Sequence, residues 1–160
     1  MQHQELVIKS LLDAWNSHVS RTNNLLDTLT EEQLLSEVAP GKNRGIYLLG
    51  HLTAVHDRMF PLLGLGTQHY PHFDDIFITS PDKVAKEMPP VAELRGYWQE
   101  VNNDLRKQFT HLTPDEWFHK HTSVSDEDFA KEPFRNRLNV LISRTNHLAY
   151  HFGQLMLLKK

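Results

Sequence analysis

Two histidines near the C-terminus, His147 and His151, are four residues apart in a segment whose apolar spacing predicts a helix. Both imidazoles would therefore lie on one helical face, one turn apart, where they could bind a single metal ion. Residue 148 is Leu, so the general-base glutamate of the H-E-x-x-H protease motif is missing. Taken alone, such a pair is more often a surface or packing feature than a ligand pair.

A third histidine, His51, lies beside the apolar stripe of another expected helix. If that helix faces the last one, His51 could complete a three-histidine site. His56 lies five residues further on, about 140° around the helix, and is not expected to reach the same ion. From its own helix alone, His51 is better interpreted as a partly buried core histidine.

Three further side chains could support such a site. Tyr47, one turn before His51, could donate a hydrogen bond to a bound ligand. Gln154 shares a face with His151 and could orient a ligand imidazole or a substrate. Arg144, one turn before His147, could attract a substrate carboxylate, although a polar group at the rim of the bundle is the favoured interpretation for it.

The remaining histidines give weaker signals. The stretch containing His69, His72, Asp74 and Asp75 could form a second site, but an exposed polar loop is the favoured interpretation. Asp57 is expected to pair with Arg58. The sequence also places no carboxylate one turn from a candidate ligand on the same helical face.

The elements that would position these residues are predicted to be helices. Apolar residues recur every three or four positions over four long segments, with capping boxes at Thr30–Gln33 and Thr113–Glu116. The pattern predicts an all-α four-helix bundle in a single domain, residues 1–160, with a long middle crossover connection. The expected long helices are 3–29, 43–63, 91–112 and 136–160; 64–90 is the long connection, and 119–135 is irregular, with room for a short strand.

Composition narrows the functional classes. The 160 residues include 11 histidines and no cysteine, so disulfides, thiolate metal sites and cysteine nucleophiles are excluded. The net charge of −3 is unlike that of an electrostatic nucleic-acid binder. No apolar run is long enough for a membrane span and no signal region is evident, so we expect a cytoplasmic protein with neither nucleic-acid nor membrane partners.

Two segments together resemble one known family. The stretch Tyr47–Leu52 and the ending His147–Gln154 are similar to the corresponding helices of the DinB-like (DinB/YfiT-like) superfamily of metalloenzymes. This resemblance implies a helical bundle holding a divalent metal, zinc, nickel or iron, at His51, His147 and His151. It also implies a small-molecule substrate and, as in many relatives, a homodimer.

Three neutral imidazoles would leave at least one coordination position open, as in catalytic rather than structural sites. Relatives include transferases and isomerases that use small thiol cofactors, and others described as metal-dependent hydrolases. The first hypothesis is therefore a metal-dependent transferase using a low-molecular-weight thiol. The alternatives are a hydrolase acting through metal-bound water and a non-enzymatic metal-binding stress-response bundle. The missing carboxylate base favours the thiol enzyme.

Overall fold

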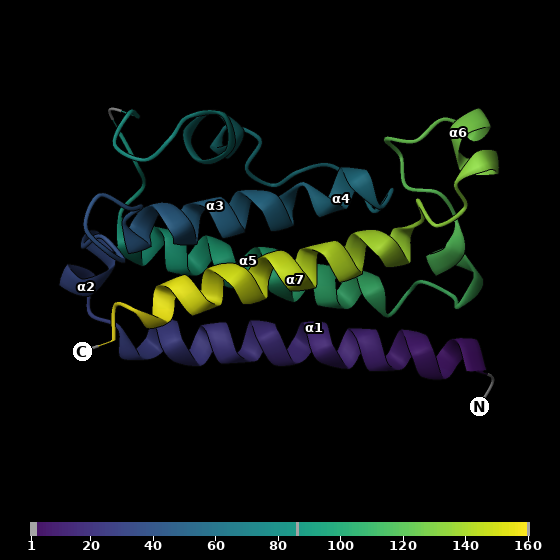
Figure 1. Cartoon of the computed structure of the whole chain (residues 1–160), viewed down its shortest axis with the longest axis horizontal. Coiled ribbons are helices and arrows are strands. Elements are labelled where there is room, and N and C mark those ends of the chain that lie inside the picture. The colour runs from purple at the N-terminus through teal and green to yellow at the C-terminus, as the bar shows by residue number, and fades with distance from the viewer. Residues whose placement is uncertain (1–2, 86, 160) are drawn as a thin grey trace.

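The computed structural model describes residues 3–85 and 87–159, and within these ranges the chain is all-helical, as predicted. Four long helices form the bundle (Figure 1): α1 (His3–Thr28), α3 (Gly45–Asp57), α5 (Val91–Phe109) and α7 (Arg137–Met156). The shorter elements are α2 (Glu31–Leu35), α4 (Met59–Leu62), α6 (Asp126–Lys131), a π-helical turn η1 (Asp75–Thr79) and a 3-10 turn η2 (Asp115–Phe118).

Local sequence signals account for several helix starts. The predicted capping box before α2 is present, with Thr30 and Gln33 exchanging side-chain and backbone hydrogen bonds. The start of α7 is set by Asn136, whose side chain accepts a hydrogen bond from the backbone N–H of Asn139. These caps satisfy backbone donors that have no partner inside the helix.

Two expectations about local structure were wrong, and a third was met only in part. The segment 119–135 contains α6, and its only strand-like feature in the described chain is an isolated bridge between Lys120 and Asn136. The expected helix 43–63 is interrupted at Arg58, which separates α3 from α4. The second box, at Thr113, is half formed: Glu116 accepts from the Thr113 backbone N–H, and only a 3-10 turn follows.

The central element is α3, which is apolar around its whole circumference. All of its residues are buried except His51. A helix of this kind must be covered on every side, and α3 is in contact with α5, α7, α2 and η1. His51 is therefore the one point at which α3 approaches solvent.

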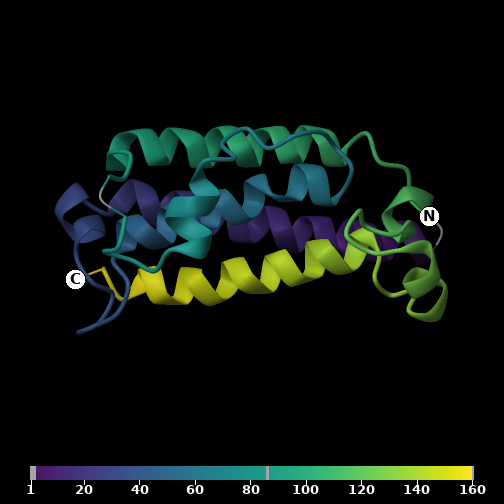
Figure 2. The ribbon, with the colours of Figure 1, turned by 90° about the horizontal axis from the view of Figure 1, so that it is seen from above.

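The long connection after α4 folds back over α3. Figures 1 and 2 show η1 lying against α3 on the side away from α1. The contact is close at Gly50, where an added Cβ would lie 2.2 Å from Cε1 of the fully buried Phe77 ring. Glycine is therefore required at position 50 for η1 to reach its place.

The core also holds one fully buried histidine. The ring of His56 lies between those of Trp15 and Trp98, with centroid distances of 4.5 and 4.9 Å. Its Nδ1 lies 2.8 Å from the amide oxygen of Asn102. Burial lowers the pKa of His56 to about 3, so this ring is neutral at pH 7. Its side chain belongs to the core.

Candidate metal centre

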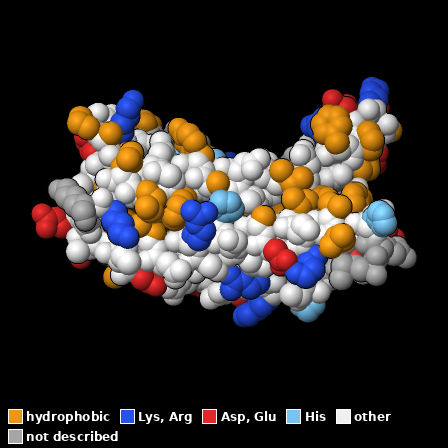
Figure 3. Space-filling model, turned by 60° about the horizontal axis from the view of Figure 1, so that its bottom comes forward, with side chains coloured by type: hydrophobic (Ala, Val, Ile, Leu, Met, Phe, Trp, Pro, Cys, Tyr) orange, Lys and Arg blue, Asp and Glu red, His pale blue; other side chains and the backbone are white. Residues whose placement is uncertain are grey.

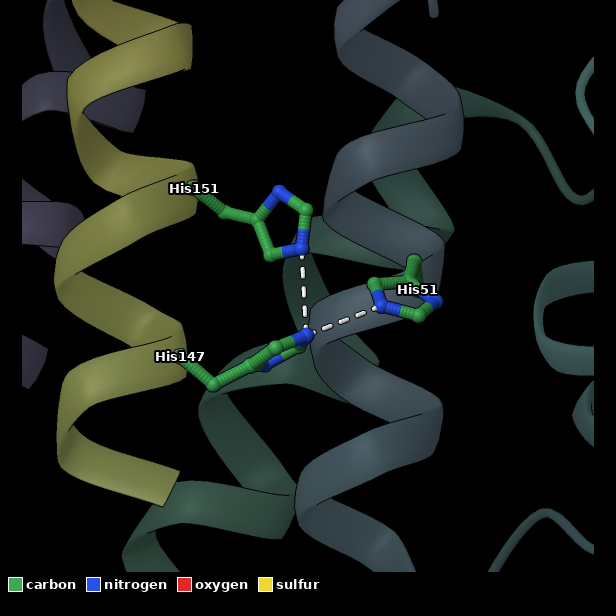
Figure 4. A group of neighbouring side chains, drawn as sticks. All are labelled: His51, His147 and His151. Atoms are coloured by element: carbon green, nitrogen blue, oxygen red, sulfur yellow. Dashed lines mark hydrogen bonds between the residues drawn. The ribbon is translucent and has the colours of Figure 1, made fainter. Parts of the chain in front are cut away.

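Three imidazoles from two helices converge between α3 and α7. The Nε2 atom of His147 lies 3.1 Å from Nε2 of His51 and 3.1 Å from Nε2 of His151 (Figure 4). The candidate ligand atoms of the three residues all lie within 4.8 Å of one another. The structure thus brings together the three histidines that the sequence singled out. Of these, His51 and His147 are 96 residues apart along the chain.

The outer ring nitrogens determine which tautomers are present. Nδ1 of His51 lies 2.7 Å from the backbone carbonyl oxygen of Phe77, which can only accept a hydrogen bond. Nδ1 of His151 lies 2.6 Å from the side-chain oxygen of Gln154. Both Nδ1 atoms therefore carry the proton, and both Nε2 atoms present a lone pair toward His147.

This donor set fits a metal ion. Two imidazoles bound to a tetrahedral zinc at about 2.0–2.1 Å would have their nitrogens roughly 3.3 Å apart, close to the separations here. Nδ1 of His147 is buried and has no hydrogen-bond partner among residues 3–85 and 87–159. Nε2 of His51 and Nε2 of His151 both offer lone pairs, and Nε2 of His147 can donate its proton to only one of them at a time. A cation bound in place of that proton would be shared by all three rings.

The three side chains are also in the protonation state that coordination requires. Burial lowers the pKa of His51 and of His151, although the hydrogen bonds to Phe77 and Gln154 oppose the shift. Burial, followed by the charges of the other two histidines, lowers the pKa of His147 to about 4. At pH 7 all three rings are neutral, so no proton competes with a metal ion.

The supporting side chains differ in their placement. Gln154 accepts from His151 as described, an arrangement in which a neighbour fixes the ring orientation of a ligand. The Tyr47 hydroxyl donates to the backbone carbonyl of Ser80 at 2.8 Å and lies 3.3 Å from that of Phe77. Its proton is thus directed to the backbone of the η1 segment, and Tyr47 anchors the stretch that contacts His51.

Arg144 lies on α7 one turn from His147, and its side chain is half-buried. Its Nε is buried with no hydrogen-bond partner in the described chain. It lines a cleft together with Arg58.

His69 belongs to a different cluster from the candidate second site of the sequence analysis, which grouped it with His72, Asp74 and Asp75. Nε2 of His69 lies 3.0 Å from a carboxylate oxygen of Asp104 on α5, and its Nδ1 lies 3.3 Å from Asp57. The expected pairing of Asp57 with Arg58 was wrong. Asp57 is fully buried and accepts the backbone N–H groups of residues 69 and 70, while Arg58 pairs with Asp74 at 3.0 Å.

Sequence reasoning missed the backbone carbonyl of Phe77 as a partner of His51. A main-chain acceptor in a non-periodic connection leaves no side-chain signal. The nearest available signal was Gly50, because a glycine inside an apolar helix often marks the close approach of another segment.

Fold and site together define a class: a helical bundle that presents three neutral histidines from two antiparallel helices at a half-buried point. The chain belongs to the DinB superfamily, whose family model matches residues 14–155. Members of this superfamily commonly bind metal ions. No curated protein matches the chain. None of the described helices combines the length and apolar character needed to cross a membrane.

Proposed function

We propose that this protein is a metal-dependent transferase that uses a small thiol cofactor, with a divalent ion held by His51, His147 and His151. The observation that supports it most directly is the convergence of three Nε2 atoms, two of them with tautomers fixed by outer hydrogen bonds. A bound ion would supply Lewis acidity and lower the pKa of a thiol brought to it.

The choice of a thiol over water rests on what surrounds the triad. In the described chain the group of ligand atoms contains three histidines and no carboxylate oxygen. The outer partners are a backbone carbonyl and an amide oxygen, neither of which can take a proton at neutral pH. A hydrolase needs a general base to remove a proton from water, whereas a thiol with a lowered pKa is itself the nucleophile.

The residues of this chain would have distinct tasks. His51 is held by Phe77 and His151 by Gln154, so both rings are oriented before any ligand arrives. Tyr47 keeps the η1 segment in place through Ser80. The half-buried position restricts water at the site while leaving one approach open.

The metal assignment is tested by elemental analysis of the purified chain. We expect stoichiometric metal in the unaltered protein, and its loss in His51→Ala and in the His147→Ala/His151→Ala double variant. His69→Ala is the matched control, because it removes a histidine from the other cluster. Stoichiometric metal in the double variant would overturn the site assignment.

The reaction class is tested with cobalt-loaded protein. A thiol enzyme should show a new thiolate-to-cobalt absorption band when a small thiol such as 3-mercaptopropionate is added. A hydrolase should instead turn over ester or amide substrates with no thiol present. Metal-dependent hydrolysis without any thiol-induced band would replace the transferase by the hydrolase; neither response would favour a metal-binding protein without catalysis.

A further inference from the structure

The guanidinium of Arg144 has no counter-ion in the part of the chain that the structure describes. Within the described residues its Nε is buried without an acceptor, and no carboxylate pairs with this side chain. Burial, and then the positive charge of Arg58, lower the pKa of Arg144. A guanidinium nonetheless stays charged in proteins, and a partly buried, uncompensated charge costs free energy. An anion from solution would offset that cost.

Arg144 lies close to the three histidines. It precedes His147 by three residues on α7, which places the two Cβ atoms about 5–6 Å apart on one face. A ligand held by Arg144 can therefore reach the triad with a linker of only a few atoms.

A second guanidinium, that of Arg58 at the end of α3, lies at the same end of the α3–α7 pair. Arg58 follows His51 by seven residues, about two helical turns along α3. Because α3 and α7 run in opposite directions, Arg144, which precedes His147, and Arg58, which follows His51, lie toward the same end of the helix pair. The two arginines accordingly line the same cleft.

The cleft that they line has a volume of 330 Å³. Figure 3 shows that the molecule is hollowed between two projections, and Figure 1 shows the η1 segment lying over α3 while α6 stands beyond α4. The other walls of the cleft are the hydroxyl-bearing Thr122 and Ser123 and the apolar Pro61 and Leu62. Among the described residues its lining contains no carboxylate.

The local charge balance indicates an anion with one negative charge. Arg58 is already paired with Asp74, at 3.0 Å. Of the two arginines that line the cleft, Arg144 is therefore the one whose charge has no counter-ion among the described residues. A carboxylate matches this balance, and a guanidinium can bind its two oxygens through parallel hydrogen bonds.

We propose that Arg144 binds the carboxylate of a small ligand whose reactive group lies at the three histidines. The carboxylate could belong to the thiol or to the acceptor that receives it. Both of these sources rest on the proposed function, whereas the carboxylate site itself can be tested without metal or thiol.

The first experiment observes Arg144 directly. In the ¹⁵N–¹H spectrum of the unaltered, metal-free chain, the Arg144 Nε–H signal is assigned by its loss in Arg144→Gln. Propionate should shift this signal with saturation, and the neutral, equally sized propionamide should not. Equal responses to the two probes would overturn the proposal. So would a saturable shift with inorganic phosphate but none with propionate, because the anion class would then be wrong.

The second experiment locates the source of the carboxylate. Cobalt-loaded protein is titrated with 3-mercaptopropionate and with 3-mercaptopropionamide, and the thiolate absorption band gives the two dissociation constants. If the carboxylate belongs to the thiol, the acid binds at least tenfold tighter. Arg144→Gln then removes this preference without loss of cobalt, and Arg144→Lys retains part of it. Arg135→Gln is the control, because Arg135 pairs with Glu132 outside the cleft.

The outcomes separate the two proposals. Equal binding of both thiols, together with a propionate shift at Arg144, assigns the carboxylate to the acceptor. Binding of neither thiol overturns the thiol-transferase function, while the propionate result still decides the anion site. A preference for the acid that persists unchanged in Arg144→Gln, without a propionate shift, overturns the role of Arg144.

Discussion

Gly50 connects the packing of the fold to the orientation of a candidate ligand. An alanine Cβ at this position would lie 2.2 Å from Cε1 of Phe77, whereas carbon atoms in favourable contact are about 3.5–4.0 Å apart. The Phe77 ring is fully buried and packs against the rings of Tyr47 and Phe73. The ring cannot simply turn away, so Gly50→Ala must displace the η1 segment by about 1 Å or more.

This displacement has two measurable consequences. Overpacking costs about 1–3 kcal/mol, offset by the roughly 0.5–1 kcal/mol that alanine gains over glycine within a helix. We therefore expect the free energy of unfolding to fall by up to about 2 kcal/mol. The Phe77 carbonyl moves with its segment and releases Nδ1 of His51. Loss of such an outer partner typically weakens metal binding by about 10- to 100-fold.

Denaturant unfolding of the metal-free protein and a competitive zinc titration measure the two effects separately. Gly96→Ala is the matched control, because an added Cβ there meets nothing within 4 Å and position 96 lies in the middle of α5. The reasoning is refuted if Gly50→Ala matches Gly96→Ala in both stability and zinc affinity. A stability loss without weaker zinc binding would show that the Phe77 carbonyl does not orient His51.

Three further predictions concern charge and backbone. Because the pKa of His56 falls from its ordinary value of 6.5 to about 3 on folding, its contribution to stability is complete above pH 6.5 and is lost as pH falls toward 3. Unfolding measured from pH 7 to 4 should therefore be less pH-dependent in His56→Leu; an unchanged slope contradicts this. Asp57→Asn should lose about 1–3 kcal/mol in denaturant unfolding, since each carboxylate oxygen accepts one backbone N–H and the amide nitrogen that replaces one of these oxygens cannot accept. Gly153→Ala should raise the melting temperature as Gly96→Ala does, because neither Cβ meets an atom within 4 Å.

The bundle was predictable because its information is local and periodic. The apolar stripe of 91–112 and the capping box at Thr30 fix helices that the structure reproduces within a few residues. The break at Arg58 was not predictable in this way. The apolar pattern continues through it into α4, and the interruption arises where Asp57 turns inward to hold the backbone of residues 69 and 70.

The candidate site was predictable to the extent that it depends on helical phase. The four-residue spacing of His147 and His151 fixes their shared face, and His51 stands beside the core stripe of α3. The proton positions depend instead on a carbonyl of η1, a segment without periodicity.

The chemistry proposed for the site follows from what its outer partners lack. A carboxylate behind a ligand histidine would add negative charge, but His51 and His151 are held by a neutral carbonyl and a neutral amide. Three neutral imidazoles leave the charge of a divalent ion undiminished, and the uncompensated Arg144 adds to the positive potential beside it. Such a potential stabilises anions, in particular a thiol that ionises on arrival and a carboxylate a few atoms away. The two proposals therefore share one electrostatic cause, and Arg144→Gln should weaken binding of an anionic thiol while leaving the three metal ligands in place.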